Sequence, residues 1–145
     1  MTATLYNAAI LRLAAGIPHH DRLAEPQGSS ERRSPVCGSR LTVDVILDEE
    51  GRIARLGQMV RACALGQASA SLMGAHAIGR SEEELIAARD ALAGFLAGTR
   101  EDPGDWPGLE IFAPARAHSA RHASIRLAFE AVAEAVALAR RARAA

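Results

Sequence analysis

The chain contains no lysine, few aromatic residues and only two cysteines. All 17 basic residues are arginine, so chemistry that forms a Schiff base on a lysine is excluded. Aromatic residues make up 3% of the sequence, which leaves no platform on which nucleic-acid bases could stack. The basic residues are balanced by 17 acidic ones, so no net charge attracts the chain to nucleic acid or to a membrane surface.

Long hydrophobic runs and signal sequences are also absent. No apolar stretch approaches the roughly 20 residues that a membrane helix requires, and residues 1–17 lack the charged and apolar regions of a secretory signal. We therefore expect a cytoplasmic protein in which Cys37 and Cys63 are reduced. At 145 residues the chain can bury a core without disulfides, and we expect a single domain over residues 1–145.

Alternating apolar residues predict an antiparallel hairpin in the first half of the chain. Every second residue from 41 to 47 is apolar, which is typical of a half-buried strand. Asp48–Gly51 supplies a turn, and a second strand is expected over residues 52–60. A further short edge strand is expected near residues 31–33.

Helical periodicity predicts one helix before this sheet and several after it. Ser81 followed by Glu84 forms the sequence of a capping box. The helices are expected over residues 4–15, 64–77, 82–97 and 120–143, with a short helical turn near 109–114 that Pro114 interrupts. The sequence therefore predicts an α+β fold, with a small antiparallel sheet of about three strands.

The two cysteines flank the predicted hairpin. Cys37 precedes its first strand and Cys63 follows its second. The start of a strand lies beside the end of its antiparallel partner, so the two thiols can approach each other; two small buried hydrophobic residues are an equally good interpretation. Residues 64–71 are mostly small and suit a helix packed closely against a neighbour, whose unpaired N–H groups favour a thiolate at Cys63.

A histidine near the start of the last helix could add a third ligand. His118 and His122 are four residues apart and would share a face if both were helical. Thiolates and an imidazole together are typical of zinc or iron–sulfur sites, although a histidine at a helix start is more often solvated or capping. The sequence contains no serine-hydrolase, phosphate-loop or zinc-protease motif.

Several motifs together resemble the NifU/IscU-type iron–sulfur cluster assembly scaffolds, especially the SufU branch, over nearly the whole chain. These motifs are Leu5-Tyr6-Asn7, the loop Pro35-Val36-Cys37-Gly38-Ser39, Cys63 with Ala68-Ser69-Ala70-Ser71, and Phe112, Pro114, Ala115 and Arg116. The resemblance implies a scaffold that receives sulfur from a cysteine desulfurase. It implies assembly of a [2Fe–2S] cluster on three cysteines and an aspartate, and transfer to apoproteins. The SufU branch binds zinc and accepts sulfur.

The third cysteine of this family pattern is missing. Aligning on Pro114-Ala115-Arg116 without a gap places Ser119 there, with His118 just before it. Aligning on the apolar stripe of the last helix places His122 or Ala123 there instead. We prefer His122, because the buried stripe determines the helix face more strongly than a loop length does.

The family aspartate is also replaced, by Ser39, whose neutral hydroxyl is a poor ligand. The resemblance then implies a site for a [2Fe–2S] cluster or Zn²⁺ at Cys37, Cys63 and His122, which His118, Ser39, water or a partner could complete. We expect a monomeric or weakly dimeric scaffold or carrier more than an enzyme, working with a cysteine desulfurase and cluster-accepting apoproteins. The alternatives are a zinc-dependent persulfide acceptor and a metal-free interaction module.

Overall fold

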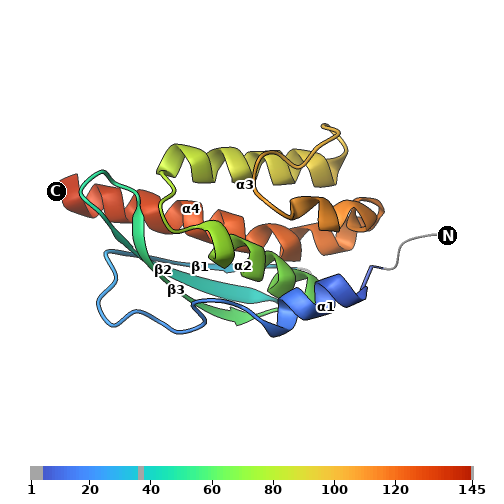
Figure 1. The fold of residues 1–145 in the computed structure, drawn as a ribbon, viewed down its shortest axis with the longest axis horizontal. Helices are drawn as coiled ribbons and strands as arrows, with labels where there is room; N and C mark the ends of the chain where they lie inside the picture. The colour runs from blue at the N-terminus through green and yellow to red at the C-terminus, as the bar shows by residue number, and fades with distance from the viewer. Residues whose placement is uncertain (1–4, 36–37, 145) are drawn as a thin grey trace.

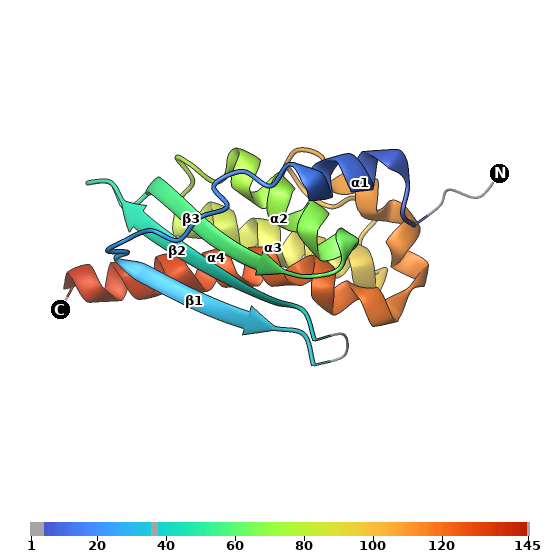
Figure 2. The same ribbon diagram turned by 90° about the horizontal axis from the view of Figure 1, so that it is seen from below.

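Three strands form one antiparallel sheet in the order β1-β2-β3 (Figure 2). The structure, a computed structural model, describes residues 5–35 and 38–144. The strands are β1 (Gly28–Arg33), β2 (Arg40–Leu47) and β3 (Ile53–Arg61). The predicted hairpin is confirmed as β2 and β3. The predicted edge strand is β1, which begins at Gly28 and is longer than expected.

One helix precedes the sheet and the others follow it. The helical segments are α1 (Ala8–Ala15), α2 (Ala64–His76), α3 (Glu82–Ala97), the 3-10 segments η1 (Leu109–Ala117) and η2 (Ser119–Arg121), and α4 (His122–Ala144). Figure 1 shows α2 and α4 lying over the sheet and α3 packed on α4, farther from the strands. The predicted α+β fold is confirmed. Among the described residues, none of these helices is both long and apolar enough to span a lipid bilayer.

The main core lies between the sheet and α4. The apolar residues predicted to alternate along β2 are all buried, and so is the predicted apolar stripe of α4: Leu41, Val43, Val45, Leu47, Ile125, Phe129, Val132 and Val136. Burying each such side chain stabilises the fold by roughly 1.5–3 kcal/mol. This contact therefore determines which face of α4 is turned toward the sheet.

The middle of the sheet's outer face is covered by the loop of residues 17–27, which packs against Asp44 and Gly57. Asp44 of β2 is fully buried beneath this loop, where it accepts hydrogen bonds from Arg22 at 2.7 Å, from Ser29 at 2.6 Å and from the Leu23 N–H at 3.0 Å. Burial alone would raise the pKa of Asp44, but these hydrogen bonds outweigh it and hold the pKa below its usual value. The loop is therefore anchored by a buried carboxylate.

The same loop covers part of the outer edge of β3. The Gln58 N–H donates to the His19 carbonyl at 2.9 Å. The Val60 N–H donates to Nε2 of His20 at 3.3 Å. Backbone groups that would otherwise remain open at this sheet edge are thus bonded within the chain.

The segment before α4 differs from the prediction. Leu109 and Phe112 insert into the core as expected, but Pro114 lies inside η1 and does not interrupt it. Phe112 and Ala115, on either side of the proline, are buried, so packing holds the segment across the missing N–H. The last helix begins at His122, later than predicted, because the preceding residues form η2.

Candidate functional site

The start of β2 and the end of β3 lie side by side, as the hairpin predicted. Arg40 pairs with Arg61 in the sheet, and Cys63 follows two residues after Arg61. Cys37 lies outside the described residues. The loop that contains it is closed by a hydrogen bond of 2.8 Å from the Ser34 N–H to the Ser39 carbonyl. The strand ends therefore bring the Ser39 and Cys63 segments to one end of the sheet.

Cys63 lies where β3 passes into α2. It is the N-cap residue of α2, with extended backbone angles (φ −66°, ψ 170°), and its side chain makes no capping hydrogen bond. Its carbonyl accepts from the Gln67 N–H at 2.9 Å, and the residue is half-buried. The predicted position of Cys63 at a strand-to-helix junction is confirmed.

A buried serine from α4 contacts Cys63. The Ser124 Oγ lies 3.2 Å from the Cys63 Sγ and 3.3 Å from the Ser39 Oγ. Ser124 is 1% exposed and Ser39 is 4% exposed. Two hydroxyls and one thiol, from three separate segments, therefore meet in one hydrogen-bonded group.

This group forms because α2 and α4 approach each other closely. A Cβ atom added to Gly66 would lie 2.6 Å from the Ser124 Oγ, so only glycine leaves room for the hydroxyl. One turn later, the Ser69 Oγ donates to the Ile125 carbonyl at 2.6 Å. The expectation of a small-residue helix packed against a neighbour is confirmed, and that neighbour is the N-terminal turn of α4.

Sequence reasoning missed Ser124. It relied on the large apolar residues of α4, whereas Ser124 begins a parallel stripe of small buried residues that continues with Ala128, Ala131 and Ala135. The spacing of four, three and four is helical. This stripe, aligned with the small residues after Cys63, was the signal that could have identified Ser124.

The two candidate histidines have different environments. His118 is exposed and non-helical (φ −116°, ψ 75°), so the two histidines do not share a helix face. His122 is half-buried at the start of α4, with its Nε2 2.9 Å from the Ala115 carbonyl. A carbonyl only accepts, so Nε2 carries the hydrogen, and Nδ1 of the neutral ring keeps its lone pair.

Residues 5–35 and 38–144 contain no group of three or more histidine, cysteine, aspartate or glutamate side chains that could hold a metal ion. The predicted ligand set of Cys37, Cys63 and His122 includes a residue outside these ranges, so it stays a prediction. The described part of the site contains the Cys63 thiol in contact with the Ser124 hydroxyl, which also contacts the Ser39 hydroxyl. The His122 imidazole, oriented by the Ala115 carbonyl, is two residues before Ser124 in the sequence.

Solved structures resemble this chain over most of its length. No family profile and no curated protein matches the sequence. The N-terminal part of a nitrogen-fixing NifU-like protein from Brucella abortus is 37% identical, with a TM-score of 0.88, over 94% of this chain and 95% of that one. A protein described as an iron–sulfur cluster assembly scaffold for the SUF system, from Fervidobacterium islandicum, is 18% identical (TM-score 0.83; coverage 91% and 96%) and shows the fold alone. A hypothetical protein is 26% identical (TM-score 0.80; coverage 90% and 95%).

Proposed function

This chain belongs to the NifU-like family, and on that premise we propose that it is an iron–sulfur cluster assembly scaffold that carries a cluster or metal ion as cargo. The observation that carries the proposal is the position of Cys63. Its thiol lies at the N-terminus of α2, beside the end of β3 and against Ser124 of α4. Three elements thus converge on one sulfur atom, in a chain that matches a NifU-like protein almost end to end.

Cys37 and Cys63 are proposed to bind the cargo through their thiolates. The start of β2, which follows Cys37, and the end of β3, which precedes Cys63, are paired at Arg40 and Arg61. His122 is proposed as the third ligand through Nδ1, since its Nε2 is engaged by the Ala115 carbonyl. Thiolate and imidazole suit both the iron of a [2Fe–2S] cluster and Zn²⁺. A hydrogen bond from the second ring nitrogen is the usual way in which a ligating histidine is oriented.

The proposed partners follow from this cargo. A cysteine desulfurase would supply the sulfur, and cytoplasmic apoproteins would receive the assembled cluster. With two cysteines in the whole chain, any sulfur that is held covalently before assembly must be held on Cys37 or Cys63.

Metal and sulfide analysis of the full-length protein tests the proposal. After anaerobic purification and reconstitution with iron and sulfide, or with zinc, the wild type should contain a stoichiometric amount of metal. The Cys37→Ala/Cys63→Ala double variant should contain none, and circular dichroism should show that it is folded. Equal metal content in the two proteins would rule out the proposed site.

A matched pair of histidine variants tests the third ligand. His122→Ala should weaken metal binding, whereas His118→Ala should not, because the His118 side chain is exposed in the segment before α4. Wild-type affinity in both variants would remove His122 from the site.

The same preparation separates the two alternative functions. Zinc-dependent stimulation of a cysteine desulfurase, lost in Cys63→Ser, would indicate a persulfide acceptor. The absence of both metal and stimulation would indicate an interaction module.

A further inference from the structure

Three arginines lie side by side across the outer face of the sheet, at the end where β3 leads into α2. Arg40 of β2 is directly opposite Arg33 of β1 on one side and Arg61 of β3 on the other. We infer that this arginine row, Arg33, Arg40 and Arg61, is a docking surface for an acidic helix of a partner protein. The inference rests on the sheet alone and is independent of any bound metal or cluster.

The whole arginine row faces away from the helices. Residues directly opposite each other in an antiparallel pair have their side chains on the same face of the sheet. Leu41 and Val60, one position from Arg40 and Arg61 and therefore on the other face, are buried in the core. The three arginines are exposed. Figure 2 is viewed from their side, with the strands in front of α4.

Little negative charge balances the arginine row. The Arg33 Nε donates to Glu31 at 2.8 Å, but within residues 5–35 and 38–144 no ion pair involves the side chain of Arg40 or Arg61. Asp44, the acidic residue of β2, is fully buried and already bonded beneath the loop of residues 17–27. The open surface therefore carries three positive charges and one negative charge.

This arrangement destabilises the free protein. Like charges directly opposite each other in a sheet repel, and Arg40 has such a neighbour on both sides. The arginines near the end of α4 are treated differently: Arg140 pairs with two glutamates of α3, and Arg143 donates to the Asp48 carbonyl at 2.6 Å. An acidic partner would remove the repulsion that the chain itself leaves in the arginine row.

The length of the arginine row fits an acidic helix. Neighbouring strands are about 4.8 Å apart, so the first and third arginine Cα atoms are separated by about 10 Å. Carboxylates at positions i, i+4 and i+7 of a helix share one face and span about 10.5 Å. Those at i, i+2 and i+4 of a strand span about 13 Å. The planar guanidinium groups can pair with such carboxylates in a bidentate manner.

The next residues of the outer face favour a protein over nucleic acid. Thr42 lies opposite Glu31 on one side and Met59 on the other. Met59 is 41% exposed and offers an adaptable apolar contact to a protein side chain. Glu31 would repel a phosphate backbone, and these two rows of residues contain no aromatic ring on which a base could stack.

Fluorescence anisotropy of the full-length protein at low salt tests the inference. The probe is a labelled helical peptide of about 18 residues with glutamates at i, i+4 and i+7, and its control is an isomer with the same glutamates spread around the helix. The first peptide should bind more tightly. Arg40→Ala/Arg61→Ala should weaken its binding about 5- to 30-fold, because each close surface pair contributes up to about 1 kcal/mol and 1.4 kcal/mol corresponds to tenfold.

Arg12→Ala/Arg55→Ala is the matched control, since it removes two exposed arginines that lie outside the row, and it should bind the peptide as the wild type does. Wild-type affinity in Arg40→Ala/Arg61→Ala, an equal loss in the control variant, or equal affinity for the two peptides would each overturn the inference. Tighter binding of a single-stranded oligonucleotide of the same charge would also overturn it.

Arg40→Thr gives a second and opposite readout. Removing the central charge should raise the melting temperature of the free protein by about 1–5 °C, while it weakens peptide binding up to about fivefold. A surface arginine without a partner would change the first quantity and not the second. Wild-type peptide affinity in Arg40→Thr would therefore contradict a docking role for the row.

Discussion

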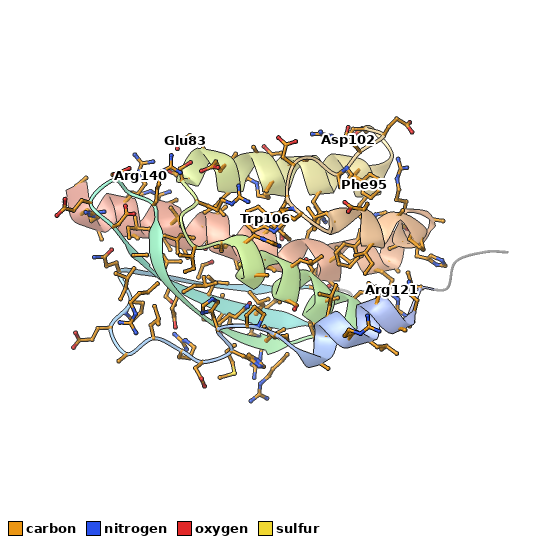
Figure 3. All side chains as sticks on the ribbon, viewed as in Figure 1. Glu83, Phe95, Asp102, Trp106, Arg121 and Arg140 are labelled. Atoms are coloured by element: carbon orange, nitrogen blue, oxygen red, sulfur yellow. The ribbon has the colours of Figure 1, made fainter. Side chains whose placement is uncertain are left out.

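The two ends of the β2–β3 hairpin are stabilised by different interactions. At the Cys63 end, neutral and mostly buried groups meet because α2 and α4 pack closely. At the Asp48–Gly51 end, half-exposed side chains form ion pairs. Figure 3 shows Arg140 beside Glu83 at this charged end, with Arg121 at the opposite end of α4. The candidate site is thus kept in place by packing, and the distant helix ends by charge and capping.

Glu84 is the centre of the charged end. Its carboxylate accepts from Arg52 at 2.7 Å, from Arg80 at 3.3 Å and from the Ser81 N–H at 3.1 Å. The predicted capping box is confirmed, because the Ser81 Oγ also accepts from the Glu84 N–H. The Ser81 N–H and then the Arg52 guanidinium hold the pKa of Glu84 at about 2. The start of β3 is in this way connected to the start of α3.

The largest effect on stability is expected at the neutral end, from Gly66→Ala. The added methyl group would lie 2.6 Å from the Ser124 Oγ and 2.7 Å from the Ala62 Cβ. Overpacking of this kind costs roughly 1–3 kcal/mol in the free energy of unfolding, and it should also separate Ser124 from Cys63 and weaken metal binding. Urea denaturation at low salt and at high salt should show the same loss.

Gly16→Ala is the matched control for this prediction. Its Cβ atom would meet nothing closer than the Arg12 carbonyl oxygen at 3.7 Å, so its stability should be close to that of the wild type. If Gly66→Ala unfolds at the wild-type urea concentration, close packing does not hold the site.

An intermediate effect is expected at the charged end, from Glu84→Ala. This variant loses one half of the capping box as well as two ion pairs, and we expect a loss of about 1 kcal/mol at neutral pH and low salt. High salt should reduce this difference because the side chains are about two-fifths exposed. Glu50→Ala is the control, since Glu50 is 83% exposed and 4.0 Å from Arg52, and it should change stability very little.

The effect of Glu84→Ala on stability should also depend on pH. The pKa of Glu84 is about 2 in the folded chain and 4.5 ordinarily. A lowered pKa means that ionised Glu84 stabilises the fold fully above about pH 4.5, and that this contribution is lost as the pH falls toward 2. The stability difference between wild type and Glu84→Ala should therefore shrink over this interval. A constant difference from pH 7 to pH 2 would contradict it.

The smallest effect is expected from Arg140→Ala. Arg140 pairs with Glu82 at 3.0 Å and with Glu83 at 3.4 Å, but its side chain is 46% exposed. Exposed pairs contribute only about 0.2–1 kcal/mol and are screened by salt. A double-mutant cycle with Glu82→Ala should give a coupling energy below about 0.5 kcal/mol at low salt. A larger coupling that persists at high salt would show that the charged end is more rigid than its exposure indicates.

The features that the sequence predicted well are those with a local signal. The hairpin follows from the apolar residue at every second position of β2, and the start of α3 follows from Ser81 and Glu84, three residues apart. The junction at Cys63 follows from a strand pattern that ends where small residues begin. Each of these needs only a few neighbouring residues, so no knowledge of tertiary contacts is required.

The features that were missed depend on contacts between distant segments. Ser124 became part of the site because Gly66, 58 positions earlier, leaves room for it. Asp44 stands at an ordinary polar position of a strand, and only the packing of Arg22 and its loop buries it. Pro114 was expected to end a helical turn because local rules say so, yet buried neighbours hold η1 together across it. In each case tertiary packing overrode or supplemented the local pattern.

The loop over the edge of β3 has a consequence for self-association. An open sheet edge is a template on which another chain can add a strand, and natural proteins block such edges. On β3, the backbone N–H groups of Gln58 and Val60 are already bonded to His19 and His20. The opposite edge, β1, is short and carries charged residues at 31–33. The sheet is thereby protected against edge-to-edge aggregation on both of its sides.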